Sequence, residues 1–197
     1  MNAPTPTDSA LKPKLAYASV GGVLLSIAGF LPWALAGRSL TRALGEAGMY
    51  AVCALVFLAA SAPLLHRLLV GGHTLRRFYA LFTAAFVPYS VAWTAGWMAL
   101  RGHPGSAAGL ALGCLAMAVV LCGWFGRWKQ IGLITLALLL FQVPGYFAGG
   151  WAYEWLGGIA RESASPTLGI VAKLSWGLFF GWGLGGGLAV ALQRLQR

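Results

Sequence analysis

The chain has 197 residues, of which 59% are hydrophobic and only 9% are charged, and its mean hydropathy is +0.75. Soluble domains carry about 25% charged residues and lack long apolar stretches, so this composition excludes a water-soluble globule. The formal net charge of +10 does not indicate nucleic-acid binding, because the basic residues lie between apolar stretches and form no stripe on a folded domain. We expect no nucleic-acid partner and a charge distribution that orients helices in a lipid bilayer.

Six apolar stretches follow a polar N-terminal tail, and each is near the ~20 residues needed to cross a bilayer. They cover residues 15–36, 48–69, 78–100, 107–125, 130–151 and 168–192. Residues 1–14 are expected to be a disordered tail, residues 194–197 a short C-terminal end, and all connections but 152–167 are short. The pattern predicts an all-α membrane protein, with one domain over residues 15–193 that is a bundle of six transmembrane helices.

The first stretch also resembles a secretory signal peptide. Lys12 and Lys14 precede it, and Ala34 and Ala36 before Gly37 fit a cleavage site with small residues. Its apolar part is longer than the usual ~7–15 residues of such peptides, which favours a retained helix. Cleavage after Ala36 remains the alternative.

Basic residues are distributed unevenly between the two sides of the predicted bundle. The side that holds both termini and two loops carries Lys12, Lys14, Arg67, Arg76, Arg77, Arg127, Lys129, Arg194 and Arg197, and the other side carries Arg38, Arg42, Arg101 and Arg161. Because cytoplasmic loops are enriched in Lys and Arg, both termini are predicted to be cytoplasmic. A composition rich in Ala, Gly, Leu and Arg indicates a bacterial source, hence a bacterial inner (plasma) membrane. Tryptophans near the stretch ends are expected at the two water interfaces: Trp33, Trp97, Trp124, Trp128, Trp151 and Trp155.

The last stretch is unusually rich in glycine. Gly177, Gly181 and Gly185 recur every four residues, so on a helix they share one face that a neighbouring backbone can approach closely. We expect this face to pack against the fourth or fifth stretch or against the same helix of a second copy. Gly183 lies about 200° away around the helix and is expected on a less crowded side. Two further glycine pairs are expected at helix contacts, Gly145 with Gly149 and Gly109 with Gly113. The large side chains of the last stretch are expected to face lipid or to fill gaps between helices: Phe179, Phe180 and Trp182.

Three prolines are spaced 56 residues apart: Pro32, Pro88 and Pro144. This spacing favours three repeats of a two-helix unit, and corresponding helix breaks often mark the binding site of a transporter. The alternative is that six evenly spaced helices give such periods by themselves, since proline is common in membrane helices.

Polar residues inside the apolar stretches are the candidates for solute binding. Lys173 is the one charged residue clearly within a stretch; it is expected either to snorkel to the interface or to bind substrate and pair with Glu154. A second polar set lies in the third and fifth stretches and consists of Tyr89, Ser90, Thr94, Gln142 and Tyr146. Pro88 and Pro144 lie nearby, and each leaves a backbone carbonyl without its helix hydrogen bond. The polar set either lines a cavity or only forms hydrogen bonds between neighbouring helices. The predicted substrate-binding residues are Lys173, Gln142, Tyr146, Tyr89 and Glu154.

Catalysis and cofactor binding have little support in the sequence. None of the three histidines lies deep within an apolar stretch, and the three cysteines form no Cys-x-x-Cys motif and no Cys/His cluster, so we expect no metal site and no cofactor. A site assembled from Lys173, Glu154 and Tyr153 is the one catalytic arrangement left open. The predicted function is a small permease or channel-like protein for an unknown solute. The alternative is a non-catalytic structural or assembly subunit, with a second copy or another membrane protein as its partner.

Overall fold

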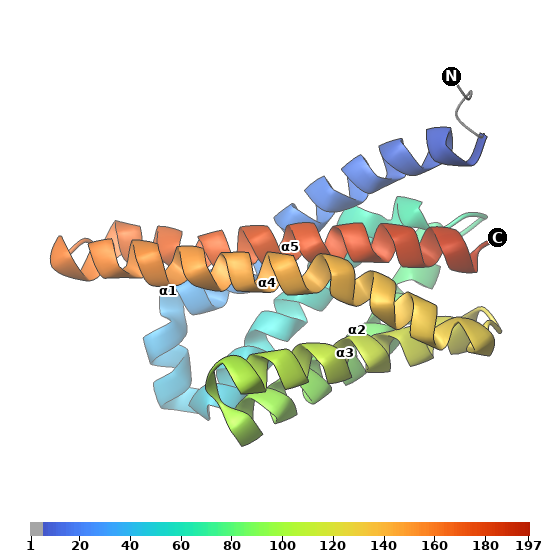
Figure 1. Cartoon of the computed structure of the whole chain (residues 1–197). Coiled ribbons are helices and arrows are strands. Elements are labelled where there is room, and N and C mark those ends of the chain that lie inside the picture. The colour runs from blue at the N-terminus through green and yellow to red at the C-terminus, as the bar shows by residue number, and fades with distance from the viewer. Residues whose placement is uncertain (1–5) are drawn as a thin grey trace.

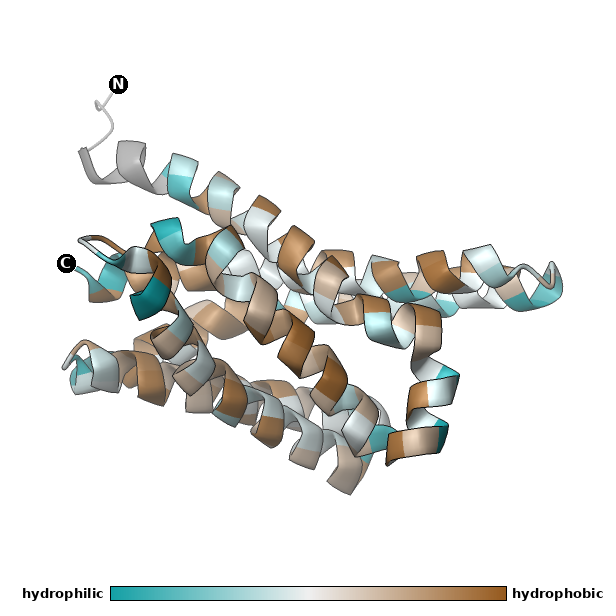
Figure 2. Cartoon of the chain, turned by 180° about the vertical axis from the view of Figure 1, so that it is seen from behind, coloured by the Kyte–Doolittle hydropathy of each residue, from teal (hydrophilic) through white to brown (hydrophobic). Residues whose placement is uncertain are grey.

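A computed structural model describes residues 6–197, which form a bundle of long helices that run roughly along one another (Figure 1). The helices are α1 (Pro6–Leu65), α2 (Thr74–Leu100), α3 (Gly102–Trp124), α4 (Ile131–Glu162) and α5 (Pro166–Leu195), with single 3-10 turns η1 (His66–Leu68) and η2 (Trp128–Gln130). All five are long and apolar enough to cross a membrane. In Figure 2 the most hydrophilic residues gather near the helix ends, as expected for a helical membrane protein.

The first two predicted helices form a single helix, α1, with one interruption. Gly45 has φ 74° and ψ 175°, a conformation that is not helical and that glycine adopts without a steric penalty. It divides α1 into an N-terminal arm (6–44) and a C-terminal arm (46–65). The arms pack together, since a Cβ added at Gly29 would overlap the ring of Phe57. The described chain therefore has five long helices, and the first of them consists of two arms that meet at Gly45.

Both the expected N-terminal tail and the long connection before the last helix are largely helical. α1 begins at Pro6, within the segment 1–14 that we expected to be a disordered tail, and residues 1–5 lie outside the described part. α4 continues to Glu162, which leaves three residues before α5, with Pro166 in its first turn and Ser165 as its cap. The Ser165 side chain accepts a hydrogen bond from the Leu168 N–H at 3.3 Å. The resulting α4–α5 hairpin extends past the turn between α2 and α3 (Figure 1).

One glycine face of α5 packs against the N-terminal arm of α1. A Cβ added at Gly181 would lie 2.6 Å from the Cβ of Ser26, and one at Gly185 would meet the carbonyl of Ala18. The prediction that this face packs against the fourth or fifth stretch or against a second copy is therefore wrong. The reason is that Ala18, Gly22 and Ser26 also recur every four residues and give α1 a matching bare face.

The opposite face of α5 is just as crowded, against α4. A Cβ at Gly183 would lie 2.5 Å from the carbonyl oxygen of Phe141, so the expectation that Gly183 is on a freer side is wrong. From α4, a Cβ at Gly145 would meet the Phe179 carbonyl at 2.5 Å, and one at Gly149 would meet Trp176. Glycines 109 and 113 of α3 pack on α2 and not on α5. α5 therefore lies between α1 and α4, with Phe180 buried at its centre and Phe179 and Trp182 exposed.

Candidate functional site

A cavity of about 170 Å³ lies between the two arms of α1 and helices α2, α4 and α5. Tyr146 of α4 and Trp176 of α5, whose rings are in contact, both line it. Most of its lining is aromatic, with a few hydroxyl groups and one thiol, and includes Phe30, Trp33, Tyr50, Cys53, Ala54, Phe57, Phe86, Tyr89, Ser90, Trp93, Thr94, Tyr146, Trp176 and Phe180.

The aromatic walls are held by ring-to-ring contacts between different helices. Phe57 of α1 stacks on Phe86 of α2, with ring centroids 4.7 Å apart and planes within 2° of each other. Tyr146 of α4 meets Trp176 of α5 edge to face at 5.3 Å. Such pairs are worth about 0.5–1.5 kcal/mol beyond the area that they bury. The walls are therefore large side chains that hold each other in place.

Polar atoms of the predicted set reach this cavity or lie directly behind it. The Tyr89 hydroxyl donates to Gln142 Oε1 at 3.2 Å, and the hydroxyls of Tyr146 and Ser106 are 3.1 Å apart. Gln142 is fully buried, and its Nε2 has no hydrogen-bond partner in the described part of the chain; the same holds for Trp176 Nε1. The structure thus brings Tyr89 and Tyr146 together with Gln142. Serine 90 and threonine 94 also line the cavity.

Lys173 does not belong to this group. Its Nζ donates to the backbone carbonyl of Trp33 at 3.1 Å and lies 5.3 Å from the centroid of the Trp33 ring. Glu154 is exposed on α4 and forms no ion pair with any side chain of residues 12–197. The alternative in which Lys173 pairs with Glu154 is therefore wrong: α4 turns Glu154 outward, and the Lys173 ammonium donates to a backbone carbonyl of α1 instead.

The ion pair that the described residues do form joins Glu46 to Arg101. Two Arg101 nitrogens approach the two Glu46 oxygens at 3.0 and 3.1 Å, and the Tyr50 hydroxyl donates to Glu46 at 3.1 Å. The Arg101 hydrogen bonds hold the pKa of Glu46 below its usual value. This pair ties the α1 break to the turn between α2 and α3, just outside the cavity.

Sequence reasoning missed most of the aromatic lining. We expected Trp33 at the water interface, but its indole lies among Phe30, Tyr153 and Trp176 at 5.4–6.0 Å. The third stretch contains a pattern that could have predicted part of this lining. Phe86, Tyr89 and Trp93 recur every three to four residues and share one face of α2. That face is the α2 wall of the cavity.

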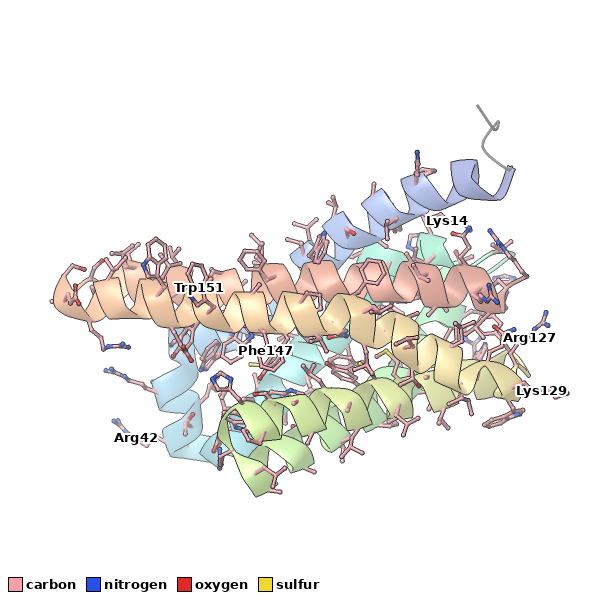
Figure 3. All side chains as sticks on the ribbon, in the orientation of Figure 1. Lys14, Arg42, Arg127, Lys129, Phe147 and Trp151 are labelled. Atoms are coloured by element: carbon pink, nitrogen blue, oxygen red, sulfur yellow. The ribbon has the colours of Figure 1, made fainter. Side chains whose placement is uncertain are left out.

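Basic side chains mark both ends of the bundle (Figure 3). Lys14, Arg127 and Lys129 lie at the end that holds both termini, and Arg42 lies at the opposite end. Phe147 and Trp151 lie on α4 between these ends. In the part of the chain whose side chains are described, residues 12–197, no three His, Cys, Asp or Glu side chains are placed to hold a metal ion.

In comparisons with known proteins, no family model, no curated protein and no solved structure matches this chain. The function is therefore argued from the cavity and its surroundings.

Proposed function

We propose that this protein is a small permease whose substrate site is the aromatic cavity. The observation that carries the proposal is a hollow of about 170 Å³ that is lined from four helices and has mostly aromatic walls. Native interiors contain few voids larger than a water molecule, and a void of this size is a usual place for a ligand.

The size and lining of the cavity limit the substrate. An apolar cavity of about 150 Å³ holds one benzene molecule, so this one accepts a single ring or a short branched chain. The Tyr89 and Tyr146 hydroxyls belong to lining residues and offer hydrogen bonds to one polar group on such a molecule. We therefore propose a ring-sized solute with a polar substituent.

Proline breaks lie next to two walls of the cavity. Pro88 directly precedes Tyr89, and Pro144 comes two residues before Tyr146. Each proline removes one helix hydrogen bond, so α2 and α4 can bend where they meet the cavity. These two positions, together with Pro32, support the proposal of three two-helix repeats around one site.

For the threading, we propose six membrane crossings, with each arm of α1 crossing once. Both termini lie at one end of the bundle in Figure 1, as an even number of crossings requires. The excess of Lys and Arg at that end supports cytoplasmic termini in a bacterial plasma membrane. The N-terminal arm covers the glycine face of α5, which supports its retention over cleavage after Ala36. Reporter fusions at Gly71 and Arg161 test this threading, with Gly71 expected inside and Arg161 outside.

A structural or assembly subunit is the second candidate. Its sequence support came from the glycine faces, and those faces are occupied within the chain by α1 and α4. One observation still favours it: Trp151 and Trp155 are 68% and 57% exposed and stack on each other at 6.1 Å. A stable hetero-complex that forms through these two rings would favour the subunit.

Uptake into proteoliposomes tests the permease. The substrates are labelled benzoate and benzylamine, two ring-sized solutes of opposite charge. Ala54 lines the cavity, so Ala54→Leu places three more carbons in it and should abolish uptake. The matched control is Ala51→Leu on the exposed face of the same arm, which should transport like the parent.

Three results separate the candidates. Uptake of either solute that Ala54→Leu blocks and Ala51→Leu preserves supports the permease. Binding in the cavity without uptake of either solute favours the subunit. Equal uptake by both variants would show that the cavity is not the route.

A further inference from the structure

A second hollow lies at the end of the bundle opposite the termini. It measures about 690 Å³ and lies between residues 34–39 of α1 and the end of the α4–α5 hairpin. A neighbouring hollow of about 470 Å³ shares Gly37, Arg38 and Lys173 with it. We call the two together the basic groove.

The charges that line the basic groove all have one sign. Arg38, Arg161 and Lys173 line the larger part, and Arg38, Arg42 and Lys173 line the smaller part. Among the side chains of residues 12–197, no Asp or Glu lines either part, and none of these four cations is in an ion pair. Four cations that gather around an open hollow without a carboxylate repel each other, and an anion would relieve that repulsion.

The backbone adds to the same field. α5 begins at Pro166 on the edge of the groove, and the N-terminus of a helix of this length carries about half a positive charge. Small residues, among them Gly157, Ala160 and Gly169, line the rest of the groove and leave its space open.

We propose that the basic groove binds a phosphate group, carried either by an anionic lipid or by a water-soluble molecule. Arginine guanidinium groups match phosphate oxygens with paired N–H donors, and a phosphate has enough oxygens for several cations at once. The Trp33 ring and the Lys173 ammonium, 5.3 Å apart, mark where the groove approaches the aromatic cavity. This site is distinct from that cavity, because Arg38 and Arg161 line only the groove.

The test uses the full chain in phosphatidylcholine nanodiscs. Equilibrium dialysis with labelled inorganic phosphate measures the soluble source. Native mass spectrometry after addition of phosphatidylglycerol measures the lipid source. The variants are Arg38→Gln and Arg161→Gln, both at exposed positions where folding does not depend on the charge, and Arg127→Gln at the opposite end is the control with the same loss of charge.

We expect saturable binding of one of the two probes. Each groove variant should weaken it by about tenfold, the usual cost of one charge-assisted hydrogen bond. The control should stay within about twofold of the parent, because its charge is far away and screened by salt. Phosphate binding without lipid retention identifies a soluble ligand, and lipid retention without phosphate binding identifies a lipid head group. Saturable binding of neither probe, or an equal loss in Arg127→Gln, would overturn the proposal.

Discussion

The two sides of the bundle are packed in opposite ways. On the α5 side, glycines bring three helices so close that an added Cβ at Gly181 or Gly183 would overlap a neighbouring backbone. On the other side, between the C-terminal arm of α1 and α2, Phe57 and Phe86 stack ring on ring and keep these two helices apart, with a cavity beside them. Small residues give close backbone contact, whereas large flat ones leave space between their edges. The comparison indicates that the first side holds the fold together and that the second has room for a ligand.

Substituting the α5 glycines should have the largest effect. Gly181→Leu and Gly183→Leu must each separate two backbones, so each should lower the free energy of unfolding by about 3 kcal/mol or more. Gly132→Leu is the control, because nothing lies within 4 Å of that position, and it should change stability by less than about 0.5 kcal/mol. Thermal unfolding in detergent measures all three. A mild loss at Gly183 beside a large one at Gly181 would show that only the α1 face of α5 is tight.

Removing a ring from the cavity wall should have a smaller effect. Phe57 is 4% exposed, and buried Phe→Ala changes cost about 3–5 kcal/mol where the site cannot collapse. Here the cavity already adjoins the ring, so fewer contacts are lost, and we expect about 2 kcal/mol for Phe57→Ala. The same thermal unfolding experiment measures it. A loss as large as that of Gly181→Leu would contradict the difference between the two sides.

Substitutions of Lys173 and Glu154 test whether these two side chains interact. Lys173→Met removes the hydrogen bond to the Trp33 carbonyl and should cost about 1 kcal/mol. Glu154→Gln should have no effect, because Glu154 is exposed and outside any ion pair in the described residues. The double variant should therefore show the sum of the two single effects in thermal unfolding. A double variant more stable than Lys173→Met alone would restore the pairing that the structure argues against.

The smallest expected effect is at Gln142. Gln142→Met removes its hydrogen bond with Tyr89 but also removes an Nε2 that lacks a partner. Interhelical hydrogen bonds in membranes average about 0.6 kcal/mol, so the net loss of stability should be no larger than that. Circular dichroism during thermal unfolding is the measurement. A loss of several kcal/mol would mean that Gln142 organises the core of the bundle.

The helical membrane class could be predicted from hydropathy alone, because each apolar stretch is long enough to cross a bilayer. The partners of the helices could not. A four-residue glycine repeat predicts a bare face but not which neighbour covers it, and the matching repeat of Ala18, Gly22 and Ser26 is less conspicuous because only one of its members is glycine.

The candidate site could be predicted only in part, for a similar reason. Tyr89 and Tyr146 were found because hydroxyls are rare in apolar stretches, and both line the cavity. Trp33 and Trp176 were not, because aromatic residues suit an interface, a core and a binding site equally well. Glu154 was misplaced because α4 runs eleven residues beyond the apolar stretch that ended at residue 151, to Glu162.

The reactivity of Cys53 tests the central claim, that the aromatic cavity is open to a ligand. Cys53 lines the cavity and is half-buried, whereas Cys114 and Cys122 are fully buried in the packed interior. N-ethylmaleimide should therefore modify Cys53 alone in the folded protein, as peptide mass spectrometry can show. Phenol, a ring-sized probe with one hydroxyl, should slow the modification, and so should Ala54→Leu, whereas Ala51→Leu should not. A modification rate that neither phenol nor Ala54→Leu changes would contradict the claim.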